Sequence, residues 1–167
     1  MEVLTGVITT AVASGTVIVL AALGELLAER TGVLNLGLEG IMAMGAVTAI
    51  IIVNEFVPSA YMGLLVAILT GALLGLVFAV ATVLLKANQV LCGLAMSFIG
   101  RGLAGRLGAP FAGQPAVARF ERLPIPLLSE IPLLGPALFN HNLLTYLAYL
   151  ALPALIFYIV HRTRHGL

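Results

Sequence analysis

The chain has 167 residues, of which 61% are hydrophobic and only 9% charged, and its mean hydropathy is +1.15. Soluble domains carry about 25% charged residues, so this composition excludes a water-soluble globular protein and indicates a membrane protein. The 8 Lys and Arg residues nearly balance the 7 acidic ones, and a net charge of +1 offers no basic surface for nucleic acid. The single cysteine excludes an internal disulfide and a multi-cysteine metal site.

Stretches without charge predict the membrane-spanning helices, because an unpaired charge at the bilayer centre costs about 2.5–3.5 kcal/mol. The 22 uncharged residues between Glu2 and Glu25 reach about 33 Å as a helix, enough to cross a hydrocarbon core of about 30 Å. Further spans are predicted at about 33–53, 61–85, 88–104 and 143–160. Pro153 predicts a kink in the last of these, because its nitrogen cannot donate to the carbonyl of Tyr149.

Residues 105–140 differ from the rest of the chain, since six of the eight prolines fall there. Prolines at that density block a spanning helix, and free backbone amides cannot sit in lipid. We therefore predict a long extracytoplasmic loop, whose apolar pieces at 125–128 and 131–134 lie on the headgroups or cap the helix bundle. The predicted fold class is all-α: a polytopic helical membrane protein of about five transmembrane helices, forming a single domain over residues 1–167.

Five spans place the two termini on opposite sides of the membrane. The basic cluster at 161–165, after the fifth helix, predicts a cytoplasmic carboxyl end. The same rule puts Arg30 and Lys86 on the cytoplasmic side, with Glu2 and Glu55 opposite.

The third predicted helix carries small residues at strict four-residue spacing, namely Ala67, Gly71, Gly75 and Ala79. Lipid supplies little hydrophobic drive for helix association, so close backbone approach between small residues must hold such helices together. The ridge predicts tight helix packing. A static contact is favoured over a moving seam between subunits.

The fourth predicted helix begins with Asn88 and Gln89 and carries one polar stripe, formed by Lys86, Gln89, Gly93, Ser97 and Arg101. Polar groups inside a membrane usually face a bundle interior or a watery path. Gln89 and Ser97 are therefore expected either to line a translocation route or to form interhelical hydrogen bonds. For Lys86 and Arg101 we favour snorkelling at the two ends of the helix.

Asn35 and Glu39 are four residues apart, which places them on one helix face, and Gly32, Gly37 and Gly40 surround them. Glycine at this density weakens a helix, and an unwound turn at membrane depth is tolerated only where it lines a cavity or is covered by protein. Glu39 is thus a functional candidate. The alternative is a glutamate near a cytoplasmic helix start, where the macrodipole favours negative charge.

Several chemical signatures fail on inspection. The glycines at 100, 102 and 105 match a dinucleotide-binding pattern, but no strand precedes them. No phosphate-binding P-loop is present, so the chain cannot bind ATP phosphates by itself. His161 and His165 have metal-ligand spacing but no third ligand, and Cys92 fits a small core residue. We therefore expect no catalytic residue, no metal and no cofactor.

Three sequence pieces, in order, carry a family resemblance: ERTGVLNLGLEGIM at 29–42, running into MGA at 44–46; NQV at 88–90 with GLA at 93–95; and RTR at 162–164 with GL at 166–167. The first strongly resembles the signature of bacterial ABC importer permeases for nucleosides and simple sugars, within the wider branched-chain amino-acid permease-like superfamily. The NLGLEG form resembles the nucleoside branch, whereas sugar permeases tend to carry an Asp-Leu-Ser version. Ser97 departs from the Asn that many relatives carry, and Arg101 from an apolar position.

The resemblance implies a multi-pass permease subunit in the bacterial cytoplasmic (inner) membrane. It implies four partners: an ABC ATPase subunit that binds the ATP, a second permease subunit, an extracytoplasmic substrate-binding lipoprotein and the lipid bilayer. Since relatives continue into a coupling helix and further spans, the chain resembles the amino-terminal half of a permease.

We expect five side chains to line the path or support it, namely Asn35, Glu39, Asn88, Gln89 and Ser97. Glu39 would hold a neighbouring polar group, while Gln89 and Ser97 would offer donors and acceptors to ribose hydroxyls or base edges. The alternative hypothesis is a complete, small structural or assembly membrane protein that packs through the ridge at 67–79.

Overall fold

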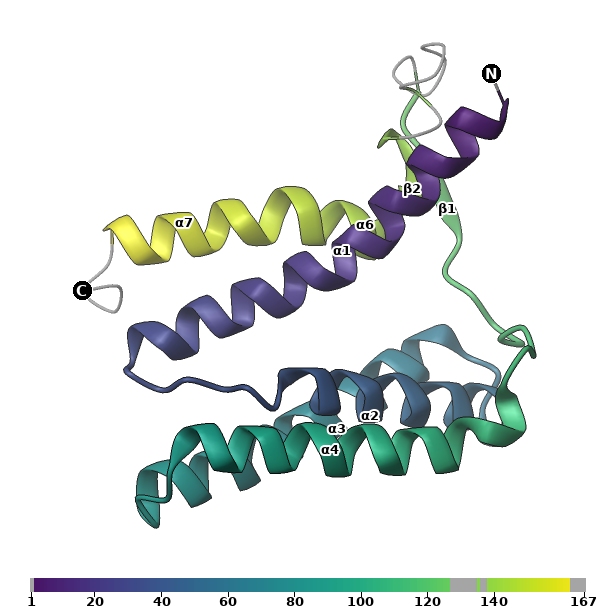
Figure 1. Ribbon diagram of the computed structural model, residues 1–167. Helices are drawn as coiled ribbons and strands as arrows, with labels where there is room; N and C mark the ends of the chain where they lie inside the picture. Colours follow the sequence, from purple (N-terminus) through teal and green to yellow (C-terminus); the bar gives the residue numbers. More distant parts are fainter. Residues whose placement is uncertain (1, 127–134, 136–137, 163–167) are drawn as a thin grey trace. The chain divides into compact units, whose positions relative to one another are not determined.

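The structure is a computed structural model that describes residues 2–126, 135 and 138–162 (Figure 1). In that part of the chain, 5 helical stretches are long and apolar enough to cross a membrane. They are Val3–Arg30, Leu38–Phe56, Ala60–Leu84, Gln89–Phe111 and Leu143–Arg162. The predicted all-α membrane fold with five spans is confirmed.

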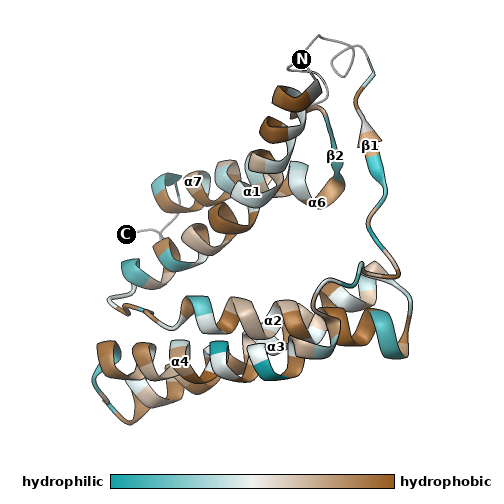
Figure 2. Cartoon of the chain, turned by 45° about the vertical axis from the view of Figure 1, so that its right-hand side comes forward, coloured by the Kyte–Doolittle hydropathy of each residue, from teal (hydrophilic) through white to brown (hydrophobic). Residues whose placement is uncertain are grey.

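The chain divides into two compact units, residues 27–119 and residues 1–26 with 120–167. The first unit contains α2 (Leu38–Ile51), α3 (Ala60–Ala79) and α4 (Gln89–Gly108). Helix α2 packs against both α3 and α4. Figure 2 shows hydrophobic residues over most of these three helices, as expected for segments whose outer surface meets lipid.

Two of these helices end in a π-helical turn: η1 (Ile52–Phe56) extends α2, and η2 (Val80–Leu84) extends α3. Between α2 and α3, Thr48 and Thr70 share a hydroxyl hydrogen bond of 3.1 Å. Pro58 lies in the short extended connection before α3. The 3-10 turn η3 (Ala109–Phe111) continues α4.

The second unit contains most of α1 (Glu2–Arg30), the strands β1 (Arg122–Pro124) and β2 (Asn140–Asn142), and the fifth helix. The strands pair antiparallel, with Leu123 opposite His141. The Tyr146 hydroxyl fixes this pair to the fifth helix, because it donates to the Leu123 carbonyl and accepts from the His141 amide, both at 3.0 Å.

The fifth helix consists of α6 (Leu143–Tyr146), the π-helical η4 (Leu147–Ala151) and α7 (Leu152–Arg162). Asn142 caps its start, since its Oδ1 accepts from the Thr145 amide at 2.9 Å. The π turn lies directly before Pro153, and the Leu152 amide donates to the Leu147 carbonyl five residues back. The kink at Pro153 stays a prediction.

The predicted boundary between the fourth helix and the following loop was wrong. The fourth helix ends at Gly108 rather than at 104, because the residues after 104 tolerate a helix until Pro110, which lies near the start of η3. The predicted loop at 105–140 therefore begins as helix, contains β1 and ends where β2 starts. Several predicted features lie outside the described residues. They are the apolar piece at 131–134 and part of the piece at 125–128 in this loop, and Arg164 and His165 of the basic cluster.

Candidate functional site

The segment between α1 and α2 is not helical. Helix α1 ends where Gly32 adopts a φ of +82°, in the left-handed region that glycine readily enters, and α2 begins only at Leu38. We call residues 31–37 the unwound segment. An unwound turn was predicted here, but Asn35 lies before α2, so the prediction that Asn35 and Glu39 share a helix face was wrong.

Side chains of α4 bind the backbone of the unwound segment. Gln89 Oε1 accepts from the Leu34 amide at 2.8 Å, and Gln89 Nε2 donates to the Gly32 carbonyl at 3.3 Å. Ser97, which is only 4% exposed, donates its hydroxyl proton to the Leu36 carbonyl at 2.9 Å. The polar atoms of both side chains thus bind backbone groups of the unwound segment. These groups have no helical partners, because the segment is not helical.

The two asparagines act locally. Asn35 Oδ1 accepts from the Gly37 amide at 2.9 Å, which forms a turn directly before α2. Asn88 Oδ1 accepts from the Leu91 amide at 3.1 Å and caps the start of α4. These contacts fix the starts of α2 and α4, the two helices that lie beside the unwound segment.

Glycines bring α2 and α4 into backbone contact. A Cβ atom on Gly100 would lie 2.6–2.7 Å from backbone atoms of Gly40, and a Cβ on Gly40 would collide with the Met96 carbonyl. A Cβ on Gly93 would lie 2.8 Å from the Leu36 amide nitrogen. Gly93 and Ser97 were predicted to lie on one stripe of this helix, but the packing role of Gly100 was not predicted, although small residues at 93, 97 and 100 signal a close helix contact.

Beside this contact, Arg101 on α4 forms an ion pair with Glu39 in the first turn of α2, with 3.2 Å between Nη1 and Oε2. The guanidinium also lies 5.5 Å from the centre of the Phe98 ring. Both charged side chains are open to the surroundings of the chain, with 50% of Arg101 and 73% of Glu39 exposed.

Arg101 lies near the middle of the α4 span, whereas Glu39 is the second residue of the α2 span. Arg101 is twelve residues after Gln89 and ten before Phe111, or about 18 Å and about 15 Å from the two ends. Snorkelling of Arg101 at a helix end, which the sequence favoured, was therefore wrong, because the helix continues past it. Lys86 does lie outside the helices, between η2 and α4.

The small-residue ridge on α3 contacts α2 along part of its length. A Cβ on Gly45 of α2 would lie 3.5 Å from the Ala67 carbonyl, and a Cβ on Gly71 would lie 3.8 Å from Ile41. Around Gly75 there is open space in the described chain. The role of this ridge, including Ala79, stays a prediction.

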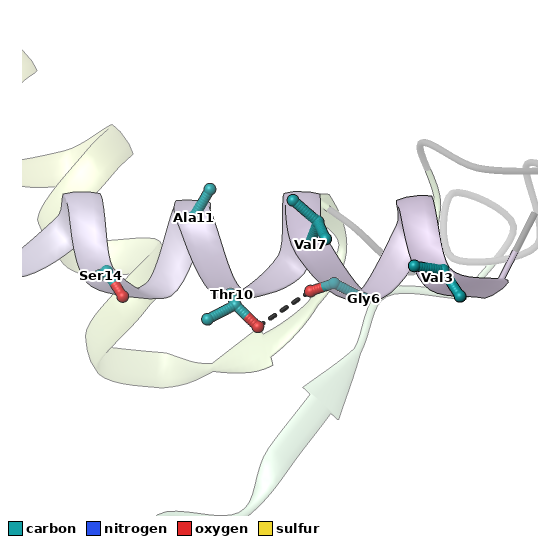
Figure 3. Close-up of a pocket in the computed structure, with 6 residues that line it drawn as sticks. All are labelled: Val3, Gly6, Val7, Thr10, Ala11 and Ser14. Atoms are coloured by element: carbon teal, nitrogen blue, oxygen red, sulfur yellow. Dashed lines mark hydrogen bonds between the residues drawn. The ribbon is translucent and has the colours of Figure 1, made fainter.

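A shallow groove runs along the N-terminal half of α1 (Figure 3). Its lining residues are Val3, Gly6, Val7, Thr10, Ala11 and Ser14. The Thr10 hydroxyl donates to the Gly6 carbonyl of the same helix at 2.9 Å. The lining carries no charged side chain, so the groove offers little to orient a polar solute.

The described residues hold no group of three or more His, Cys, Asp or Glu side chains that could bind a metal. His161 Nδ1 lies 3.0 Å from the Phe157 carbonyl, and its ring stacks on Phe157. His165, which the sequence pairs with it, lies outside the described residues.

Five apolar spans and an unwound segment packed on α4 define a multi-pass membrane protein. Residues 7–167 match the family model described as the permease component of the branched-chain amino acid transport system. The chain therefore belongs to this permease family, which favours a transport component over the structural protein considered as the alternative.

Three curated relatives are similar to the chain. One from Haloferax volcanii, provisionally named the glucose ABC transporter permease protein TsgC13, is 36% identical over 100% of this chain and 51% of its own length. The guanosine ABC transporter permease protein NupQ of Bacillus subtilis is 31% identical over 90% of the chain and 50% of its own. The nucleoside ABC transporter permease protein NupC of Lactococcus lactis is 30% identical over 91% and 50%.

The chain spans about half the length of these relatives. No solved structure matches it significantly.

Proposed function

We propose that the chain forms part of the permease of an ATP-binding cassette importer, which moves nucleosides or related simple sugars across the cytoplasmic membrane. The match to the permease family over residues 7–167 carries this proposal. The names of the three relatives support the two substrate classes. ATP is hydrolysed by a partner subunit, and a second permease and an extracytoplasmic substrate-binding lipoprotein complete the importer.

Within this importer, the unwound segment and its contacts with α4 support the translocation path. Gln89 and Ser97 hold the segment through its Gly32, Leu34 and Leu36 backbone groups. Asn35 and Asn88 shape the helix ends beside it. These four side chains stabilise the geometry of the path, since the contacts above direct their polar atoms to the protein backbone.

The unwound segment suits such a role because non-helical backbone inside a membrane is tolerated only where protein covers it or where it lines a water-filled cavity. A neutral solute needs hydrogen-bond partners and no net counter-charge. The near absence of charge in the five spans favours neutral polar solutes over ions.

Uptake of labelled guanosine and glucose tests the proposal. The chain is expressed together with the other components of its transporter, in a host that lacks its own nucleoside and sugar importers. We expect ATP-dependent accumulation of at least one of the two solutes, and loss of it when the partner ATPase is inactivated. Absence of uptake for every nucleoside and simple sugar, with all components present in the membrane, would contradict the proposal.

A further inference from the structure

Near the unwound segment, the Glu39–Arg101 ion pair is a charged feature with hydrogen-bonding capacity left over from the contacts of the described residues. A carboxylate offers about four acceptor sites and a guanidinium five donors. Among the described residues, the Glu39 carboxylate has the Arg101 guanidinium as its partner through a single contact of 3.2 Å. In contrast, the polar atoms of Gln89 and Ser97 already form hydrogen bonds with the backbone of the unwound segment.

The start of α2 adds donors at the same place. Gly37 caps the helix without a side-chain hydrogen bond, and the amides of the first turn have no acceptor within the helix. Glu39 belongs to this turn, so amide donors lie beside its carboxylate. The helix start, the carboxylate and the guanidinium together form a group of donors and acceptors with near-zero net charge.

This group lies near the middle of the α4 span, beside the start of the α2 span, and is open. Gly40 and Gly100 are in backbone contact, so Glu39 lies at the same level as Arg101, about 15–18 Å from either end of the α4 span. Charges at that depth are strongly disfavoured against lipid and almost always face a bundle interior or a watery cavity. With 73% and 50% of the two side chains exposed, the pair requires polar surroundings.

We infer that Glu39 and Arg101 line the translocation path and bind a pair of neighbouring hydroxyl groups on the sugar ring of the transported solute. The carboxylate accepts hydrogen bonds from both hydroxyls, and the guanidinium donates to one of their oxygens. The inference rests on the proposed function, in which nucleosides and simple sugars share such a ring. The sequence predicted that Gln89 and Ser97 contact the solute; here Glu39 and Arg101 take that role instead.

The test compares a solute with an analogue that lacks one hydroxyl: guanosine with 2′-deoxyguanosine, or glucose with 2-deoxyglucose. Initial uptake rates are measured in vesicles that contain the whole transporter, with the solute-loaded binding protein at saturation, so that the membrane step sets the rate. We expect Glu39→Gln to slow the complete solute about tenfold and the deoxy analogue less than twofold. The ratio to compare is the uptake rate of the complete solute divided by that of its deoxy analogue. Arg101→Lys keeps the charge and should reduce this ratio by a smaller factor than Glu39→Gln.

Glu55→Gln and Arg106→Gln are matched controls, since Glu55 and Arg106 are also exposed and lie outside the ion pair. Both should leave the ratio unchanged. Equal slowing of both solutes by Glu39→Gln would make the pair a structural tie between α2 and α4, and an unchanged rate would remove it from the path. Either result overturns the inference while the proposed function stands. If the wild type carries neither nucleosides nor sugars, both fail.

A second measurement does not depend on transport by the variant. Cys92, the single cysteine, is first replaced by Ala, and Cys is then placed at position 39 or, as a control, at Ile99, an apolar position of α4 that is 60% exposed. We expect a water-soluble, charged thiol reagent to label position 39 at least about tenfold faster than position 99. Equal labelling rates at the two positions would contradict a place of Glu39 in the path.

Discussion

Replacing Gly100 by Ala tests whether the backbone contact between α2 and α4 holds the site together. The added Cβ would lie 2.6–2.7 Å from the O, C and Cα atoms of Gly40. Carbon atoms pack at about 3.5–4.0 Å, so the helices must separate by roughly 0.7 Å or more. Both sides of the contact are backbone, so no side chain can rotate away to relieve it.

The cost follows from this separation. Overpacking of this kind destabilises proteins by about 1–3 kcal/mol. The shift would also lengthen the distance of 2.9 Å between Ser97 Oγ and the Leu36 carbonyl past the range of a good hydrogen bond, which removes about 1 kcal/mol more. Alanine favours a helix over glycine by up to about 1 kcal/mol, which offsets part of the loss.

Gly102→Ala and Gly105→Ala are matched controls on the same helix, because a Cβ at either position meets nothing within 4 Å in the described chain. Thermal unfolding in detergent is followed with a dye that reacts with Cys92 as it becomes accessible; the chain contains no Trp for intrinsic fluorescence. We expect Gly100→Ala to unfold several degrees below both controls, at about 2–4 °C per kcal/mol. An equal or higher unfolding temperature would refute the packing argument.

Three further predictions concern other contacts. Gly63→Ala brings a Cβ to 2.6 Å from Val53 Cγ2, so it should destabilise the protein by about 1–3 kcal/mol. Val53→Ala in the same chain should restore part of this loss. Additive losses of the two substitutions in thermal unfolding would contradict the contact. Ser97→Ala should cost about 1 kcal/mol in the same assay, and no change would show that the bond to Leu36 contributes nothing. Gln89→Ala should speed hydrogen exchange of the Leu34 amide, whereas Gln89→Glu, which keeps an acceptor, should not; equal exchange in both would refute the bond to Gln89.

The number and order of the spans could be predicted from the sequence because hydropathy responds to long stretches without charge. The start of α2 could not be predicted, since Leu34 and Leu36 are as apolar as helix residues although they lie in the unwound segment. The groups that stabilise this segment, Gln89 and Ser97, come from positions 55 to 61 residues further along the chain. A pattern within a single window cannot contain that information.

The candidate residues at 35, 39, 88, 89 and 97 were found from their polarity inside apolar spans. The partners of the residues at 35, 88, 89 and 97 were not, because backbone amides and carbonyls carry no sequence signal. Gly100 appeared only in a chance dinucleotide pattern, and its packing role depends on Gly40 of another helix. Arg101 was misplaced because the predicted helix ended at 104, which put the arginine close to the membrane surface.

Helix α4 combines two separate roles on neighbouring positions. Gly93, Ser97 and Gly100 follow each other at steps of four and three residues and meet the unwound segment and α2, while Arg101 lies about 100° further around the helix. Between α2 and α4 there is no room for a methyl group, whereas a Cβ on Gly45 would fit beside Ala67 of α3 at 3.5 Å. We therefore expect α2, the unwound segment and α4 to move as one body during transport, which keeps Glu39 and Arg101 paired while the surfaces around them change.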